Sequence, residues 1–497
     1  MRGATRSRSS TGDTQERLQV ALSHAQNGDA GEAQRLLEQL HRTDARHPGV
    51  RNALGVLRLE SGDSTGALQL LRPLARELPH VDGIQLNLGN ALVAARRAAE
   101  AIAPLRRAAA RQPDSAVICY GLARALHFAG RVAEAESVYQ TVLRLDPGHG
   151  EARSSLAAAY NFIDRYTDAE REARQVLLQS PHAAGAHFNL AVSLLSQGRW
   201  EQGWTEYEWR DRTGLLHAQR RTWDRPRWEG ERVDGRTILV HAEQGFGDTI
   251  QFARYLPVLR DRGATVVLQC PAPLVALLQH AGLADNVISF GDALPAHDLQ
   301  VSLTGLCHRL RCHTVADVVV QGGPYLQRIA GRSVELPERT GALRVGLVWA
   351  GSATHVNDMH RSCELRVLEP LLATPGVGWV SLQTGDRAAD LRRLPRSIPV
   401  HDVTQQLRDF ADTAAAVAAL DLVISVDSAV AHLAGAMGRP CWLMLPQVGL
   451  DWRWAAPGLA TAWYQDIWPV RQPSAGDWGG VVAQMRARLV TMVGQLA

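Results

Sequence analysis

Residues 88–113 read LGNALVAARRAAEAIAPLRRAAARQP, and residues 122–147 read LARALHFAGRVAEAESVYQTVLRLDP. The two stretches begin 34 residues apart and carry a small residue at the same place. That step recurs through the first two hundred residues, with small residues at Ala33, Ala67, Ala101, Ala135, Ala169 and Gly203. An aliphatic and then a small residue precede each of them, at Val20-Ala21, Leu54-Gly55, Leu88-Gly89, Leu122-Ala123, Leu156-Ala157 and Leu190-Ala191. Such a period indicates repeated supersecondary units.

The residue types of the repeat predict pairs of antiparallel helices. Small residues let two helices approach closely, and the aliphatic residue fills the seam between them. A proline follows most anchors, at Pro79, Pro113, Pro147 and Pro181, where one unit ends and the next begins. Glycines between the two helices of a pair predict turns at Gly28, Gly62, Gly130 and Gly198. The first half of the chain is therefore expected to be an α-helical solenoid.

This pattern resembles the tetratricopeptide repeat (TPR), over about six units in residues 16–212. The aromatic last unit, with Trp200 and Trp204, suits a repeat that caps the stack against a following domain. The resemblance implies a face that binds proteins or peptides; the alternative is that the repeats only stack on the next domain or dimerise. The basic, Ser/Thr-rich segment 1–15 is expected to be a disordered arm.

The composition excludes several kinds of chemistry. All 53 basic residues counted as Lys plus Arg are arginine. A Walker A lysine and a pyridoxal phosphate Schiff base are therefore impossible, and anions must be bound by arginine, histidine or backbone amides. The net charge of +3 does not indicate a general nucleic-acid binder. Six scattered cysteines, with no apolar run of membrane-spanning length, favour a cytoplasmic protein, possible membrane contact being peripheral at the inner membrane.

The second half alternates between strand and helix patterns. Apolar strands are predicted at Thr237–Ala242, Thr265–Cys270, Asn286–Phe290, Leu299–Leu303, Arg344–Ala350, Trp379–Leu382, Leu422–Val426 and Cys441–Leu445, with a helix at Thr249–Arg262. Such alternation indicates parallel α/β sheets, in two Rossmann-like lobes. After a connector at 213–236, the lobes are expected at 237–335 and 336–497. Ligands of such sheets bind beyond the carboxyl ends of strands.

Three loops in that position carry candidate site residues. The first holds Gln244, Gly245, Gly247 and Asp248, and Asp248 either caps the following helix or faces the cleft as a carboxylate. The second holds Gly351 and Arg361, a plausible diphosphate cradle or an ordinary solvated loop. The third holds Ser425, Asp427, Ser428 and His432, and opens a helix at 429–437. Its amides, hydroxyl and histidine could bind an anion, although a lone histidine is usually packed.

These motifs together resemble glycosyltransferase family 9, which includes the heptosyltransferases. The resemblance rests on Gly245-Phe246-Gly247-Asp248, Gly346-Leu347-Val348-Trp349-Ala350-Gly351, Arg361-Ser362, Asp427-Ser428, His432 and Gly438-Arg439-Pro440, over residues 236–490. Repeats before AEQGFGDTIQFARYLP, and the later DWRW and GDW segments, are similar to bacterial TPR proteins with such a domain. The resemblance implies a GT-B fold and a nucleotide-sugar donor as substrate, with no cofactor.

The resemblance also implies roles for individual residues. Asp248 corresponds to a proposed general base, with Glu243 as the next candidate. Asp427, Ser428 and His432 correspond to the diphosphate motif. Arg361 stands near where heptosyltransferases have a phosphate-binding lysine, and Ala429 replaces a frequent glycine. Both departures bear on which sugar and nucleotide are used.

The expected function is therefore inverting, metal-independent transfer of a sugar to a hydroxyl of a protein or glycan, which the repeats recruit. An alternative from another class is a TPR scaffold whose transferase-like half is inactive. A nucleotide-sugar epimerase is a third reading, which leaves the repeats unexplained. The pairs Cys307-His308 and Cys312-His313 form only half of a zinc pattern, and packing explains them better.

Overall fold

The computed structural model describes residues 5–214, 223–318, 323–339, 343–355, 357–455 and 462–496. For residues 5–12, 315 and 318 only the backbone is described. The chain divides into two compact units, Met1–Tyr160 and Asn161–Ala497. Each unit is described by itself below.

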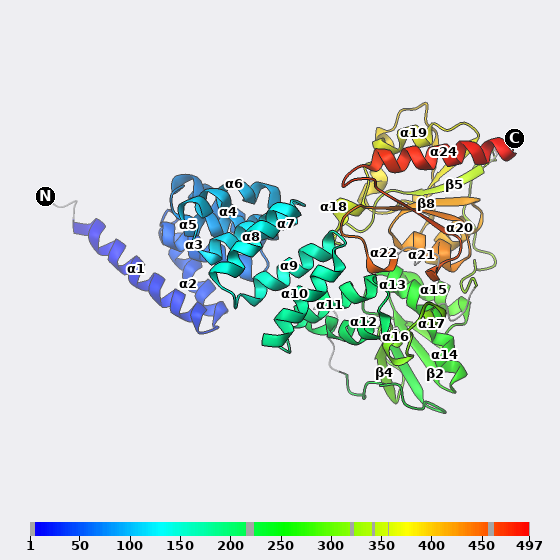
Figure 1. The fold of residues 1–497 in the computed structure, drawn as a ribbon, viewed down its shortest axis with the longest axis horizontal. Coiled ribbons are helices and arrows are strands. Elements are labelled where there is room, and N and C mark those ends of the chain that lie inside the picture. Colours follow the sequence, from blue (N-terminus) through cyan, green and yellow to red (C-terminus); the bar gives the residue numbers. More distant parts are fainter. Residues whose placement is uncertain are drawn as a thin grey trace. The chain divides into compact units, whose positions relative to one another are not determined.

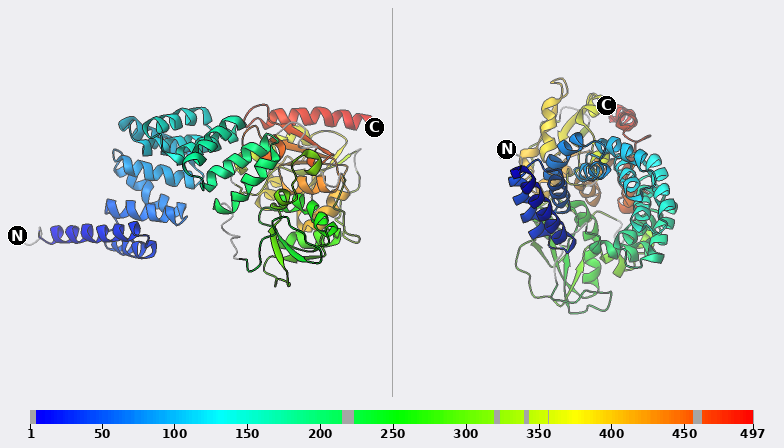
Figure 2. Two further views of the ribbon diagram at one scale, coloured as in Figure 1. Left: turned by 60° about the horizontal axis from the view of Figure 1, so that its bottom comes forward. Right: turned by 90° about the vertical axis from the view of Figure 1, so that its left-hand side faces the viewer.

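The first unit is a stack of antiparallel helix pairs (Figures 1 and 2). Its helices are α1 (Thr5–Gln26), α2 (Ala30–Thr43), α3 (Pro48–Glu60), α4 (Ser64–Glu77), α5 (Asp82–Ala94), α6 (Ala98–Arg111), α7 (Ala116–Phe128), α8 (Val132–Leu145) and α9 (Gly150–Phe162), the last ending in the second unit. The anchors Ala33, Ala67, Ala101 and Ala135 are all fully buried. This burial confirms that the repeated small residues form the seams of a helical solenoid.

Two glycines show why the seam needs small residues. A Cβ atom on Gly55 would lie 2.7 Å from Cγ of Leu71, and one on Gly89 would lie 2.6 Å from Cγ of Leu105. The leucine comes from the second helix of the same pair in both cases. The close approach of α3 to α4 and of α5 to α6 therefore depends on these glycines.

The turns inside the pairs share one left-handed residue. Gly28, Gly62, Gly130 and Gly198 have φ values of 83°, 88°, 75° and 75°. The same position of the remaining repeats is held by Arg96, with φ 60°, and by Asp164, with φ 62°. These are unusual values for residues with a Cβ atom. The backbone geometry of the turn thus persists in repeats whose sequence lacks the glycine.

The N-terminal segment differs from the expectation. Helix α1 begins at Thr5, inside the 1–15 segment expected to be disordered, and residues 1–4 lie outside the described part. Further along the helix, Leu18 and Ala21 pack in the core of the first repeats. Once these two residues anchor the helix, adding further turns toward the N-terminus does not require buried side chains in those turns.

The second unit begins with the last helices of the solenoid. These are α10 (Tyr166–Gln179), α11 (Ala184–Ser196) and α12 (Trp200–Tyr207), followed by the 3₁₀ turn η1 (Glu208–Arg212). Trp200 and Trp204 are buried, and their rings contact Trp463 and Trp452 of the α/β region at centroid distances of 5.7 and 5.3 Å. The aromatic last unit is thus buried against the α/β region, as expected. Part of the predicted connector, residues 215–222, lies outside the described residues.

A four-stranded parallel sheet follows, in the order β3-β2-β1-β4 (Figure 1). Its strands are β1 (Thr237–His241), β2 (Thr265–Cys270), β3 (Asn286–Ser289) and β4 (Leu299–Ser302), close to the predicted bounds. The helix expected at 249–262 begins earlier and is divided into α13 (Phe246–Phe252), η3 (Ala253–Tyr255) and α14 (Leu256–Asp261). Pro257, which has no N–H group, stands in the first turn of α14 and explains the second break. Short helices α15 (Ala272–Ala281), α16 (Leu306–Arg309) and α17 (Val315–Val318) complete this lobe.

A six-stranded parallel sheet forms the rest, in the order β10-β9-β8-β5-β6-β7. Its strands are β5 (Leu343–Val348), β6 (Val377–Ser381), β7 (Val400–Asp402), β8 (Leu422–Val426), β9 (Cys441–Leu445) and β10 (Ile467–Arg471). The helices around it are α18 (Asp358–Arg361), α19 (Glu369–Leu372), α20 (Phe410–Ala418), α21 (Ala429–Ala436), α22 (Trp452–Ala455) and α24 (Trp478–Leu496), with 3₁₀ turns η4 (Leu365–Leu368), η5 (Asp386–Arg393) and η6 (Thr404–Gln406).

Strands β7 and β10 were not predicted. They lie at the two edges of the sheet, where a strand is less buried and has a weaker apolar pattern. Among the described residues, no helix is both long and apolar enough to cross a membrane.

Candidate functional site

The loop after β1 begins with two residues that are held by the end of the solenoid. The Glu243 carboxylate is buried and accepts hydrogen bonds from Nε and Nη2 of Arg210, at 3.0 and 2.7 Å, and from Thr304. The amide of Gln244 donates to the hydroxyl of Tyr207 at 2.9 Å. The carboxylate of Glu243 is therefore bound to Arg210. The side-chain amide of Gln244, which was predicted to bind the nucleotide-sugar donor, is bound to Tyr207.

Asp248 caps α13 and also faces a partner from the other lobe. Its Oδ2 accepts from the backbone N–H of Gly245 at 3.0 Å, which forms the capping contact considered in the sequence. Its Oδ1 accepts from the guanidinium of Arg453. Burial raises the pKa of Asp248 above its usual range, although Arg453 acts to lower it. The two readings of Asp248 are thus compatible in one geometry, because the cap leaves Oδ1 directed at the second lobe.

Arg453 is a candidate site residue that the sequence analysis did not select. It is only 4% exposed and donates through Nη1 to both oxygens of Asp451, at 3.0 and 3.1 Å. Its Nε donates to the side-chain oxygen of Gln251. Burial acts to raise the pKa of Asp451, but Arg453 outweighs it and the pKa lies below its usual value. The DWRW segment, residues 451–454, was the available signal, but its arginine could not be assigned a partner 205 residues away.

Gly247 brings the first lobe against the second. A Cβ atom on Gly247 would lie 2.7 Å from Cδ2 of His432. The sequence analysis placed this glycine among the candidate site residues, and in the structure its neighbour is His432 of α21, another of those candidates. Helices α13 and α21 are in extensive contact. Two residues chosen from separate motifs therefore meet at one point.

His432 is neutral in this environment. It is 6% exposed, and burial lowers its pKa to about 3. Its Nδ1 lies 3.0 Å from the hydroxyl of Tyr464, and its Nε2 lies 3.9 Å from Oδ1 of Asp427. Burial raises the pKa of Asp427 to about 6, with a further contribution from the charge of Asp451 and an opposing one from Arg361. His432 is both packed, as a lone histidine usually is, and adjacent to the predicted anion motif.

The end of β8 presents hydrogen-bonding groups at the start of α21. Ser425 is fully buried, and its hydroxyl lies 2.8 Å from the hydroxyl of Ser428 and donates to the carbonyl of Val426. Ser428 is the N-cap residue, but its side chain makes no capping hydrogen bond. The hydroxyl of Ser425 thus positions that of Ser428. The backbone N–H groups at the start of α21 are not capped by Ser428 and are open to another acceptor.

Arg361 and Gly351 form the third part of the site. A Cβ atom on Gly351 would lie 2.6 Å from Nη2 of Arg361, so the absence of a side chain makes room for the guanidinium. The Nε of Arg361 is buried and has no hydrogen-bond partner in the described part of the chain. Its ion-pair contact with Asp358 is long, at 3.8 Å. The backbone N–H of Gly351 donates to Ser362 at 3.0 Å. Arg361, whose side chain is 13% exposed, is therefore a largely buried cation with unused donor capacity.

The site thus combines the buried Arg453 and the largely buried Arg361 with carboxylates from both lobes. Asp248 binds Arg453, Gly247 lies against His432, and Asp427, beside His432, feels the charge of Arg361. Gln244 and Ser425 support the loops from behind. Such a set can bind an anion through arginine and place a carboxylate beside it. Within the described residues, no cluster of three or more His, Cys, Asp or Glu side chains has the arrangement of a metal site. The thiols of Cys307 and Cys312 are buried in the core of the first lobe.

Comparison with protein families supports the assignment of repeats in the first half of the chain. Residues 24–88, 92–160 and 163–203 match the tetratricopeptide repeat. The class of the solenoid is therefore that of TPR repeats, which are protein-interaction modules. The second half is a parallel-sheet α/β region.

Among curated proteins, the chain is similar to the protein FlbA of Caulobacter vibrioides, with 27% identity over 283 residues. The match covers 52% of this chain and 47% of FlbA, so the chain spans about half the length of this curated relative.

Solved structures similar to this chain include two TPR proteins and MamA. One is a thermophilic TPR protein of Thermus thermophilus, with 23% identity, a TM-score of 0.32 and coverage of 37% of this chain and 99% of that one. Another is YrrB, described as a TPR protein with an unusual peptide-binding site, with 17% identity, a TM-score of 0.29 and coverage of 34% and 88%. MamA of Desulfovibrio magneticus has 18% identity, a TM-score of 0.31 and coverage of 34% and 96%.

Proposed function

We propose that the α/β region is an inverting glycosyltransferase of the GT-B type, built from two Rossmann-like lobes. It moves a sugar from a nucleotide-sugar donor to a hydroxyl of a protein or glycan that the TPR repeats recruit. The observation that carries the proposal is the meeting of two neighbouring first-lobe residues with the second lobe: Asp248 binds Arg453, and Gly247 lies against His432. Residues from two lobes at one point are what a reaction between two substrates requires.

The chemistry assigns a role to each group. Asp248 takes the proton of the acceptor hydroxyl while the oxygen of that hydroxyl attacks the anomeric carbon. The bond from the anomeric carbon to the diphosphate breaks at the same time. A carboxylate with a raised pKa is a better base than an ordinary aspartate at neutral pH. Arg361 and the N-terminus of α21 stabilise the departing nucleoside diphosphate. In this proposal the arginines and the helix amides supply the charge that stabilises the departing diphosphate, so the transfer needs no metal ion.

The deciding experiment is a donor screen on the full chain. Nucleotide sugars are tested for thermal stabilisation and for release of nucleoside diphosphate in the presence of cell-derived acceptor proteins. We expect one donor to raise the melting temperature of both the parent and Asp248→Asn, and only the parent to release diphosphate. If no nucleotide sugar binds at millimolar concentration, the transferase proposal fails.

A second candidate is a TPR scaffold whose α/β region does not catalyse transfer. One observation favours it: both oxygens of Asp248 already accept hydrogen bonds, from Gly245 and from Arg453. A carboxylate held in this way must accept a proton on a remaining lone pair or exchange a partner. Donor binding without turnover, for every acceptor fraction tested, would support this second function.

A further inference from the structure

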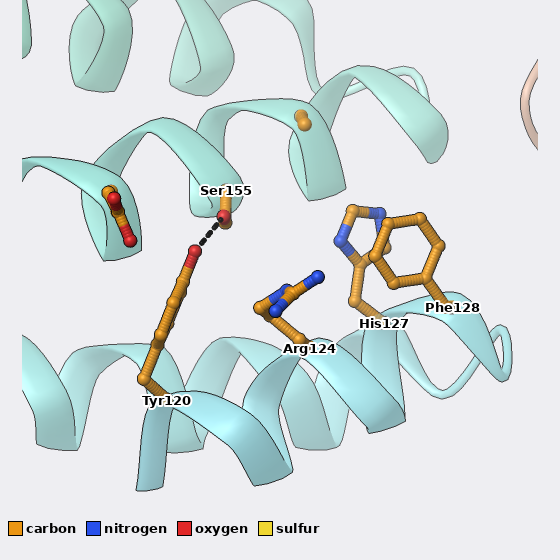
Figure 3. Close-up of a pocket in the computed structure, with 7 residues that line it drawn as sticks. Tyr120, Arg124, His127, Phe128 and Ser155 are labelled. Carbon is orange, nitrogen blue, oxygen red and sulfur yellow. Dashed lines mark hydrogen bonds between the residues drawn. The ribbon is translucent and has the colours of Figure 1, made fainter. Parts of the chain in front are cut away.

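A cavity opens between α7 and α9, the first helices of two successive repeats (Figure 3). Its volume is about 450 Å³, within the range of pockets that bind small ligands or side chains. Six of its lining residues carry the argument: Tyr120, Arg124, His127, Phe128, Glu151 and Ser155. All belong to the first compact unit.

Arg124 supplies the positive charge of this cavity. Its guanidinium lies 5.7 Å from the ring centre of Tyr120, between the side chains of Tyr120 and His127 (Figure 3). Among the described residues it has no hydrogen-bond acceptor and no ion-pair partner. Other arginines of the unit, such as Arg51 and Arg111, pair with carboxylates of the other helix in the same pair. The five N–H donors of Arg124 are thus available to a ligand.

The position of Arg124 is occupied by uncharged residues in neighbouring repeats. One period of 34 residues earlier stands Asn90, and one period later stands Ala158. His127 adds no charge, because burial lowers its pKa to about 4. The carboxylate of Glu151 is exposed at the edge of the cavity. The positive charge of the cavity is therefore concentrated at the guanidinium of Arg124.

Apolar surface flanks the charge along α7. Val117 and Phe128 are 60% and 52% exposed, and the Phe128 ring stacks on His127 at 5.1 Å. With Tyr120 and Arg124 they follow the spacing i, i+3, i+7 and i+11, which places them on one face of the helix. At 1.5 Å per residue the stripe is about 16 Å long, the span of about five residues of extended chain.

We propose that this stripe binds an extended segment of a partner polypeptide in which an acidic side chain enters the cavity and apolar neighbours cover Val117 and Phe128. The Arg124 fork holds the carboxylate through two parallel hydrogen bonds, as guanidinium groups do in bidentate pairs. The hydroxyls of Tyr120 and Ser155, which lie 3.2 Å apart, also line the cavity. A carboxylate is favoured over a dianionic phosphate because the cavity offers a single guanidinium and is also lined by the acidic Glu151. The proposal stands whether or not the α/β region catalyses transfer.

The test uses the full chain and fluorescent nonapeptides with blocked ends. One peptide carries a central Asp between Phe and Leu, and the others replace Asp with Asn or with phosphoserine. Fluorescence anisotropy at low salt is expected to give the Asp peptide at least tenfold tighter binding than the Asn peptide. Arg124→Gln is expected to remove that difference, and Arg107→Gln, a change at an exposed arginine of α6, is expected to keep it.

Three further measurements serve as controls. Glu151→Gln is expected to tighten the Asp peptide two- to fivefold, because it removes a negative charge beside the ligand. Circular dichroism of Arg124→Gln checks that the repeats remain folded, and Phe128→Ala gives an independent loss of affinity for both the Asp and the Asn peptide. Equal affinity for Asp and Asn peptides, discrimination that survives Arg124→Gln, tighter binding of the phosphopeptide, or no binding at millimolar concentration would each overturn the proposal.

Discussion

The guanidinium of Arg453 and the carboxylate of Asp248 form an ion pair between two lobes, joining residues 205 positions apart in the sequence. The arginine is almost completely buried and also holds Asp451. Removing one member of such a pair leaves the others without a counter-charge, which is costly in a buried site. The contact therefore links the stability of the α/β region to the candidate site.

Replacement of Arg453 by methionine should lower the free energy of unfolding by about 1–3 kcal/mol, because two partly exposed carboxylates lose their counter-ion. Urea unfolding followed by tryptophan fluorescence measures the change. The matched background is Asp248→Asn, in which Arg453→Met should cost less. An additive double variant would contradict the coupling between the two side chains.

Asp248→Asn should reduce transfer by about 10²–10⁴-fold once a donor is known, since the amide cannot accept the acceptor's proton. Its oxygen can still accept from Gly245, so the cap and the fold should persist. Donor affinity should change by no more than a few-fold. Asp261→Asn, at an exposed position at the end of α14, is the control and should transfer normally. Unchanged turnover in Asp248→Asn would remove this residue from the role of base.

Gly247→Ala should destabilise the chain by about 1–3 kcal/mol, because the new methyl group would overlap the His432 ring of the other lobe. The control is Gly245→Ala, where the methyl group, adjoining residues aside, would come nearest to an Asp248 oxygen at an ordinary 3.4 Å. Thermal unfolding compares the two. Restoration of stability in Gly247→Ala combined with His432→Ala would confirm the steric cause; equal losses in the two alanine variants would contradict it.

The left-handed turns allow a stabilising change. Arg96→Gly should raise stability by up to about 1 kcal/mol, since glycine adopts positive φ without the penalty that a Cβ atom brings. Gly62→Ala is the reverse test at the same position of an earlier repeat, where the added methyl group would meet no atom within 4 Å. It should destabilise by about 1 kcal/mol. Melting temperatures that move in the opposite directions would show that the turn conformation is not limiting.

His432 should make stability depend on pH. In the unfolded chain it binds a proton below pH 6.5, whereas in the folded chain its pKa is about 3, so its contribution is lost as the pH falls through this window. Asp427 acts in the opposite sense between pH 6 and 3.8, because the folded chain keeps its proton. As the pH falls from 6.5 to 4, His432→Gln should therefore become more stable relative to the parent. A difference that does not vary with pH would place the histidine in a solvated setting.

The sequence was sufficient for the repeats and for most strands, for a physical reason. The seam residues act within one helix pair, and a central strand is buried on both faces, so both leave a local pattern. The turn at Arg96 and the edge strand Val400–Asp402 leave none. Arg453 escaped notice because its function depends on contacts with Asp248 and Gln251 in the other lobe, which no spacing along the chain reveals. The arrangement of Asp248 as a cap that also meets a charge likewise required the fold.

The buried thiols have a practical consequence for labelling the protein. All six cysteines are buried, and burial raises the pKa of Cys270, Cys363 and Cys441 to about 12, so these thiols react slowly with alkylating reagents. Lysine amines are absent altogether. A cysteine introduced in place of the exposed Phe128 would therefore be the fastest-reacting thiol, and the rate at which it takes up a dye would report directly on whether the groove beside α7 is covered.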